Sequence, residues 1–216
     1  CRLAGITVRK HGTVPPSRGI LLTPNHTGYA DIFVLAAILP VSFVSKDEVA
    51  RWPLVGLGAR LTGHIFIARK RARPLVEAGE ALQNCLSDGG TACVFCEGTS
   101  FGDREVHPFM PSLLEPAIRV GSPVVPVAIR WSARRPGVSY SEDIAYWGDH
   151  EIGPHILRLL GLGGIEADVF FGRPEDPSGR NRKDLAAELR GRVEDLASGR
   201  EGADCRERSQ PKGNSE

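Results

Sequence analysis

Short apolar runs and helical patterns alternate along this chain, and this alternation restricts its fold more than any other feature. Runs rich in Val, Ile, Leu and Phe, bounded by Gly or Pro, have the length of strands; they cover residues 19–22, 41–45, 64–68, 91–95, 124–131 and 167–171. Helical patterns occupy residues 30–39, 73–87, 112–120 and 184–197. Strands that alternate with helices predict a single α/β domain, with a mostly parallel sheet flanked by helices.

The composition excludes several classes of protein. Of the 216 residues, 41% are hydrophobic and 25% are charged, which is the balance of a globular chain rather than a disordered or fibrous one. The 27 Lys and Arg against 26 Asp and Glu give a net charge of +1, which argues against a nucleic-acid partner bound through bulk charge. The longest apolar stretch is interrupted by Pro40, so no predicted segment spans a bilayer by itself.

Both ends of the chain differ from the middle. Residues 198–216 contain no Val, Ile, Leu or aromatic residue, so we expect a disordered polar tail after a domain of residues 1–197. The chain begins with Cys1 rather than Met, in the middle of what reads as a domain. We therefore expect that a segment precedes it. Residues 133–151 contain three aromatic residues without a clear period, and we expect a long loop there.

The cysteines favour a reducing compartment, because five is an odd number and their spacing is irregular. Cys93 and Cys96 form a CxxC pair, which is compatible with redox chemistry or with half of a zinc site. The pair lies inside the apolar run of residues 92–96, and no second pair of metal ligands follows it. We therefore interpret both cysteines as buried residues of a strand.

The first motif with chemical content is NHTGYAD, residues 25–31, directly after a predicted strand. The carboxyl ends of parallel strands are where α/β folds place ligands. Asp31 follows His26 by about one helical turn, so its carboxylate is within reach of one imidazole nitrogen. No Ser or Cys nucleophile stands beside the histidine, so the pair suits direct deprotonation of a substrate hydroxyl. A surface histidine and a helix-capping aspartate explain the same letters, and the motif alone is weak.

Two further motifs also follow predicted strands. GHIFIAR, residues 63–69, continues into a cluster of cations that could bind an anionic group. The same cations are explained equally well as the solvent-exposed start of the next helix. FCEGTS, residues 95–100, predicts a tight polar turn whose backbone amides are able to bind an anion. No nucleotide-binding glycine motif is complete, and we expect no cofactor.

In this order and spacing, the motifs resemble those of the phospholipid/glycerol acyltransferase family, the PlsC type. NHTGYAD is similar to the family's NHxxxxD box, GHIFIAR to its GxxFIxR box, and FCEGTS to its FPEGTR box. VVPVAI, residues 124–129, resembles the fourth, apolar block, and the similarity extends over about residues 5–175. The resemblance implies a glycerol-3-phosphate acyltransferase-like fold.

The resemblance also implies an activity and a site. A fatty acyl group would pass from an acyl thioester, acyl-CoA or acyl carrier protein, to the free hydroxyl of a lysolipid. The first acceptor to expect is 1-acylglycerol-3-phosphate, in phospholipid biosynthesis at the cytoplasmic face of a membrane, such as a bacterial inner membrane. His26 would be the general base and Asp31 would orient it. The residues expected to bind substrate are Gly63, Phe66, Ile67, Arg69, Glu97, Gly98 and Thr99.

Two departures from the family pattern change the expectation. Cys96 replaces the usual Pro, which we attribute to a strand that runs one residue further. Ser100 replaces the usual Arg, so either Arg104, Arg69 and Arg71 compensate or the head group is not a phosphomonoester. A Ser or Thr at this position resembles the pattern of lyso-ornithine lipid acyltransferases, so lyso-ornithine lipid is the leading alternative acceptor.

Rival functions stay open from the sequence. A transacylase between phospholipids would use the same pair of residues. A hydrolase with Cys96 as nucleophile is a poorer interpretation, because burial raises the pKa of a thiol. A non-catalytic module could bind a lipid surface through the cations of residues 69–73.

Overall fold

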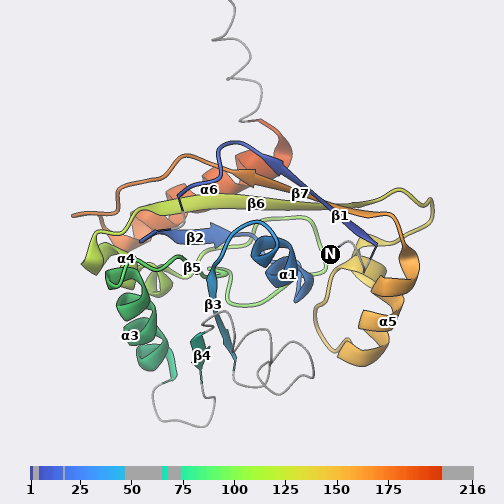
Figure 1. The fold of residues 1–216 in the computed structure, drawn as a ribbon, viewed down its shortest axis with the longest axis horizontal. Coiled ribbons are helices and arrows are strands. Elements are labelled where there is room, and N and C mark those ends of the chain that lie inside the picture. Colours follow the sequence, from blue (N-terminus) through green and yellow to red (C-terminus); the bar gives the residue numbers. More distant parts are fainter. Residues whose placement is uncertain (2–4, 17, 47–64, 68–73, 201–216) are drawn as a thin grey trace, which may run out of the picture.

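The computed structural model describes residues 1, 5–16, 18–46, 65–67 and 74–200 (Figure 1). Its framework is a seven-stranded sheet with the order β1-β7-β6-β2-β5-β3-β4. The strands are β1 Ile6–His11, β2 Leu21–Pro24, β3 Ser42–Lys46, β4 Ile65–Ile67, β5 Ala92–Cys93, β6 Val124–Ala133 and β7 Ile165–Phe171.

The sheet is mostly parallel, as predicted. Strands β6, β2, β5, β3 and β4 run in one direction, and β1 is parallel to β7. The junction of β6 with β7 is antiparallel, with Val127 opposite Phe171 and Ala133 opposite Ile165. Strands β1 and β7, the first and last of the described chain, therefore form a parallel pair that joins the rest of the sheet through this antiparallel junction. We call this pair the β1–β7 annex.

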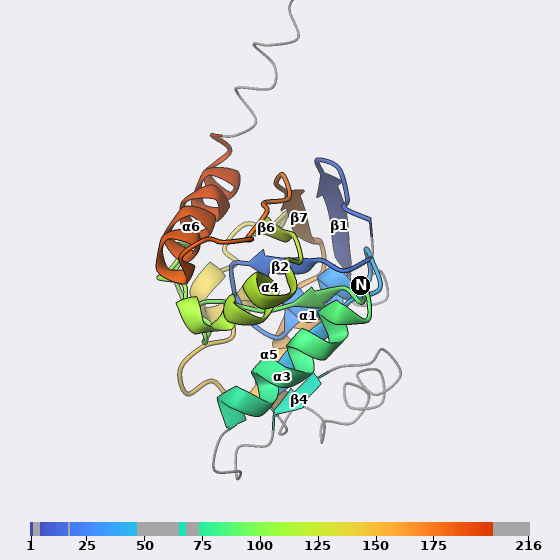
Figure 2. The ribbon, with the colours of Figure 1, turned by 90° about the vertical axis from the view of Figure 1, so that its left-hand side faces the viewer.

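Helices cover both faces of the sheet (Figures 1 and 2). They are α1 Ala30–Ala36, α3 Pro74–Ser87, α4 Glu115–Val120, α5 Ile152–Leu162 and α6 Arg182–Ser198, with a 3₁₀ turn at Pro111–Leu113 and a π turn at Tyr140–Ile144. Side chains of α1 pack in the core on one face, and those of α3, α4 and α6 pack on the other.

Strand β2 lies between the two cores. Leu21 and Leu22 are consecutive and both fully buried, but they belong to opposite clusters because side chains alternate across a strand. A strand buried on both faces reads as a continuous apolar run, which is why it was visible in the sequence. This central position fixes the loop that follows β2.

Several predicted boundaries need correction. The helix expected at residues 112–120 begins only at Glu115, because a 3₁₀ turn precedes it and Pro116 sits in its first turn. Strand β5 stops at Cys93, so Cys96 lies in a turn and not in a longer strand.

Two elements were absent from the prediction. Strand β1 carries the charged residues Arg9 and Lys10 at the sheet edge, and α5 lies in a segment to which no element was assigned. Within the described residues, no helix is long and apolar enough to cross a membrane. Most of the predicted tail lies outside the described residues, and α6 ends at Ser198.

Candidate active site

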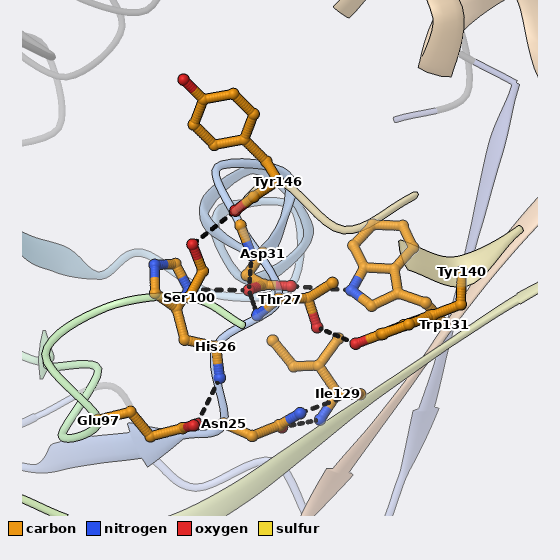
Figure 3. A network of polar contacts seen from close by, with 11 residues as sticks. Asn25, His26, Thr27, Asp31, Glu97, Ser100, Ile129, Trp131, Tyr140 and Tyr146 are labelled. Atoms are coloured by element: carbon orange, nitrogen blue, oxygen red, sulfur yellow. Dashed lines mark hydrogen bonds and ion pairs between the residues drawn. The ribbon is translucent and has the colours of Figure 1, made fainter. Parts of the chain in front are cut away.

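The Asn25 side chain holds the loop between β2 and α1, because its amide pairs with strand β6 as a backbone peptide group would. The Asn25 amide donates to the carbonyl of Ile129 at 3.1 Å, and its Oδ1 accepts the Ile129 N–H at 2.7 Å (Figure 3). These bonds extend the β2–β6 ladder beyond Pro24. His26 is thereby held at the carboxyl end of a central parallel strand, the edge at which the sequence predicted it.

His26 and Asp31 are in direct contact. The imidazole Nδ1 lies 3.0 Å from Asp31 Oδ2, and the Asp31 side chain is fully buried while that of His26 is 18% exposed. A carboxylate only accepts hydrogen bonds, so Nδ1 carries the proton and Nε2 keeps its lone pair. The histidine is therefore held in the tautomer of a proton acceptor.

Three further donors surround the Asp31 carboxylate. Oδ2 also accepts the backbone N–H of Thr27 at 2.7 Å and that of Gly28 at 3.0 Å. Oδ1 accepts the indole N–H of Trp131 at 2.8 Å. The buried charge is thus compensated by four N–H groups, one of which comes from His26.

The ring of His26 is also held from its face. It stacks on Phe95, with the ring centroids 3.9 Å apart and an angle of 22° between the planes. Phe95 belongs to the third motif, which follows β5. The first and third motifs therefore meet at the histidine itself, as strand neighbours in a parallel sheet should.

Glu97 binds the backbone on both sides of this contact. It is 8% exposed; Oε1 accepts the His26 N–H at 2.8 Å, and Oε2 accepts the His107 N–H at 3.1 Å (Figure 3). Burial raises the pKa of this carboxyl above its ordinary value, although the two N–H groups act in the opposite direction. Among the described contacts, Glu97 connects segments of main chain.

The rest of the third motif forms a tight, exposed turn. Gly98 has φ +75°, a backbone conformation that favours glycine, and a Cβ there would lie 2.7 Å from Met110 Sδ, so a larger residue would strain the turn. Gly98 and Thr99 are exposed. Ser100, at the position where the family resemblance led us to expect Arg, donates its hydroxyl to the Tyr146 carbonyl at 2.5 Å.

The Tyr146 segment closes over the loop of His26. Its N–H donates to the Thr27 carbonyl at 3.0 Å, and a Cβ on Gly28 would lie 2.8 Å from the Tyr146 Cβ. Behind it, His155 of α5 donates from Nε2 to the Ala145 carbonyl at 2.9 Å and accepts the Tyr29 hydroxyl at Nδ1, at 2.8 Å. Burial lowers the pKa of His155, which favours the neutral ring that these bonds need.

The predicted site residues are only partly placed by the structure. It brings His26, Asp31 and Glu97 together, with Gly98 and Thr99 beside them. Phe66 and Ile67 belong to β4, which pairs with β3 at the far end of the sheet order. Gly63, Arg69 and the remaining cations of residues 69–73 lie outside the described residues.

Arg104, named as a compensating cation, is engaged elsewhere. Its Nη1 donates to the Trp131 carbonyl at 3.0 Å, and its guanidinium lies 4.2 Å from the centroid of the Tyr140 ring. Both thiols of the CxxC pair are fully buried, and burial raises their pKa, which disfavours the thiolate that a nucleophile requires.

Sequence reasoning missed the supporting residues. Trp131 and Tyr140 lie a hundred residues or more from the first motif. Tyr146 lies in the segment without a clear period, and His155 lies in α5, which was not predicted. A buried indole N–H normally has an acceptor, but the burial of Trp131 is known only from the structure, so the sequence held no signal for it.

Known proteins share this arrangement of sequence. The profile of the Acyltransferase family matches residues 5–130. The lyso-ornithine lipid O-acyltransferase of Rhizobium meliloti (strain 1021) is 34% identical over 211 residues, which is 93% of this chain and 72% of that protein. The enzyme of the same name from Brucella abortus (strain 2308) is 35% identical over 90% of this chain and 77% of its own length.

Enzymes named for a different acceptor are also similar. A 1-acyl-sn-glycerol-3-phosphate acyltransferase of Neisseria gonorrhoeae is 32% identical over 52% of this chain and 44% of its own length. The solved 1-acyl-sn-glycerophosphate acyltransferase PlsC of Thermotoga maritima shares the fold, with a TM-score of 0.62 and 24% identity over 96% of this chain and 74% of that one. The chain therefore belongs to the Acyltransferase family and is an acyltransferase.

Proposed function

We propose that this protein transfers a fatty acyl group from an acyl thioester to the free hydroxyl of a lysolipid, with His26 as the general base. The observation that carries the proposal is the 3.0 Å contact of His26 Nδ1 with the buried Asp31 carboxylate. This contact leaves Nε2 as a proton acceptor on a partly exposed ring.

The reaction follows from that tautomer. Nε2 of His26 takes the proton of the acceptor hydroxyl while the oxygen attacks the thioester carbonyl. The tetrahedral intermediate then expels the thiolate, which recovers the proton from the imidazolium, so that an ester and a free thiol are released. Asp31 stabilises the imidazolium between the two steps. No acyl-enzyme is formed, because the attacking oxygen belongs to the acceptor.

As acceptor we propose lyso-ornithine lipid rather than 1-acylglycerol-3-phosphate, which the family resemblance put first. Relatives named for lyso-ornithine lipid match over 72% and 77% of their lengths. Ser100 agrees with this choice, because it offers a neutral hydroxyl that already binds the Tyr146 carbonyl. A phosphomonoester carries a charge of about −2 at neutral pH and normally needs a cation in that position.

1-Acylglycerol-3-phosphate is the second candidate, favoured by the similarity to the Neisseria enzyme. The donor in this proposal is acyl-CoA or acyl carrier protein, and action at a membrane surface is proposed because the lysolipid acceptor resides in a membrane. A panel of purified protein with each acceptor and each donor decides among these combinations. We expect transfer to lyso-ornithine lipid that depends on added thioester, which also separates this activity from transacylation.

The His26→Ala variant tests the chemistry. It should lose transfer by about 10²–10⁴-fold, the usual contribution of a general base, and keep the wild-type melting profile within a few degrees. His11→Ala is the matched control, since His11 also contacts an aspartate, Asp168 at 2.6 Å, but in the β1–β7 annex. Full activity of His26→Ala, or equal losses in both variants, would contradict the proposal.

A further inference from the structure

Trp131 is the partner of Asp31 that lies farthest away in the sequence. It belongs to β6, is 1% exposed, and packs within the core cluster that contains α1. An indole N–H is a donor with no other function in such an environment, and it needs an acceptor when buried. Here the acceptor is Asp31 Oδ1, at 2.8 Å.

The two oxygens of Asp31 accept hydrogen bonds from different donors. Oδ2 accepts the His26 Nδ1–H and the backbone N–H groups of Thr27 and Gly28. The described hydrogen bond to Oδ1 comes from Trp131. The torsion between Cβ and Cγ of an aspartate is broad, so a carboxylate held at one oxygen can rotate. Holding the second oxygen fixes the carboxylate plane.

Trp131 is itself held by the same network. Its carbonyl accepts a hydrogen bond from Arg104 at 3.0 Å, and Arg104 lies over the ring of Tyr140. The Tyr140 hydroxyl is 3.1 Å from Thr27 Oγ1, and the Thr27 N–H returns to Asp31 (Figure 3). The contacts therefore form a closed circuit that begins and ends at the Asp31 carboxylate.

We infer that Trp131 is a positioning residue for the His26–Asp31 pair: its indole N–H fixes the carboxylate plane and shares its negative charge. The inference rests on the proposed function, which assigns the chemistry to His26. Trp131 acts through Asp31. Its removal should therefore change how firmly the imidazolium is held, and leave the binding of substrates unchanged.

The Trp131→Phe variant keeps an aromatic ring and removes the N–H. We expect kcat to fall about tenfold, with both KM values within about twofold of wild type. The acid limb of the pH–rate profile should move to higher pH, because a carboxylate that has lost one donor attracts the imidazolium proton more strongly. A role in packing alone would lower the rate by the same factor at every pH.

A double-mutant cycle with Asp31→Asn separates positioning from packing. If Trp131 acts through the carboxylate, Trp131→Phe should cause little further loss in the Asp31→Asn background. Trp147→Phe is the matched control, since its indole N–H also donates to an oxygen, the Ser141 carbonyl at 3.0 Å, but does not contact Asp31. We expect it to keep the wild-type pH profile.

Two further measurements control for misfolding of the variant and for an incorrect assignment of the function. Site-specific replacement of Trp131 by 3-benzothienylalanine keeps the shape and removes only the N–H, so it should reproduce the Trp131→Phe profile. Nitrogen-15 NMR of His26 reports the hydrogen bonding of the ring without turnover, and Trp131→Phe should shift the Nδ1 resonance, because the carboxylate that accepts its proton has lost one donor.

The outcomes are distinct for the two claims. If wild type transfers no acyl group to any lysolipid, the proposed function fails, while the NMR comparison still decides the role of Trp131. If wild type is active but the variant has an unshifted pH profile and an unchanged Nδ1 resonance of His26, the inference is overturned. A full tenfold loss on top of Asp31→Asn would overturn it as well.

Discussion

Asp31 and Glu97 are both buried carboxylates that bind His26, but they bind different parts of it. Asp31 is fully buried and contacts the imidazole, whereas Glu97 is 8% exposed and contacts the backbone N–H of the same residue. Asp31 comes from the helix that follows the loop. Glu97 comes from a separate strand end, 71 residues away along the chain from His26.

The difference indicates how the work is divided between the two motifs. A contact with the imidazole fixes which nitrogen holds the proton, and it can therefore change the chemistry directly. A contact with the main chain fixes where the loop lies relative to its neighbour, and it acts mainly on stability. We therefore expect the first motif to contribute reactivity and the third to contribute architecture.

The largest effect is expected at Asp31. Asp31→Asn should reduce kcat by about 10³–10⁴-fold, because the amide cannot stabilise the imidazolium or enforce its tautomer. Steady-state kinetics with saturating donor measure the loss, and circular dichroism checks that the fold persists. A loss of less than tenfold would remove the contrast with Glu97.

Glu97→Gln should act mainly on folding. One acceptor oxygen is replaced by a donor that faces a backbone N–H, so we expect the free energy of unfolding to fall by about 2–3 kcal/mol. Denaturant titration measures it, with the exposed Glu105→Gln as control. At a temperature where both proteins are folded, kcat should fall far less than in Asp31→Asn; equal kinetic losses would show that Glu97 also takes part in the chemistry.

His155 extends the comparison to pH. Its pKa is lowered by burial, so its contribution to stability is present above about pH 6.5 and is lost as the pH falls, because the unfolded chain binds the proton first. We expect His155→Gln to cost about 1–2 kcal/mol at pH 8 and less at pH 5. Unfolding curves at the two pH values give the difference; a cost that grows on acidification would contradict this sign.

The smallest effect is expected at Ser100. Ser100→Ala removes one hydrogen bond to the Tyr146 carbonyl and should reduce the free energy of unfolding by about 0.5–1.5 kcal/mol. We expect kcat for lyso-ornithine lipid to stay nearly unchanged, so that Ser100, like Glu97, contributes to stability rather than to the chemistry. A large rise in KM would instead place the Ser100 hydroxyl in contact with the acceptor.

The sequence predicted those parts of the molecule whose causes are local. Six of the seven strands overlap apolar runs that are visible in the sequence, and the contact of His26 with Asp31 spans only five positions. Strand β1 was not predicted because it is an edge strand, in which Arg9 pairs with Glu166 and only Ile6 is buried. Its pairing with β7 depends on the far end of the chain, which no local pattern records.

The support of the site was invisible for the same reason. Trp131 reaches Asp31 across 100 positions, and the Asn25 amide pairs with Ile129 across 104. Such contacts follow from the order of strands in the sheet, and alternating apolar patterns do not specify that order. A buried Trp normally needs a hydrogen-bond acceptor, but neither its burial nor its acceptor is visible in the sequence.

The bond of Ser100 to the Tyr146 carbonyl has a consequence for how acceptor preference can evolve. The Tyr146 main chain is held between two motifs, because its N–H binds the Thr27 carbonyl while its carbonyl binds Ser100. An arginine introduced at position 100 would lose that bond and leave the carbonyl without its donor. We therefore expect a change of head-group preference at this position to need matched substitutions in both segments, and single substitutions at position 100 to be poor starting points for altered selectivity.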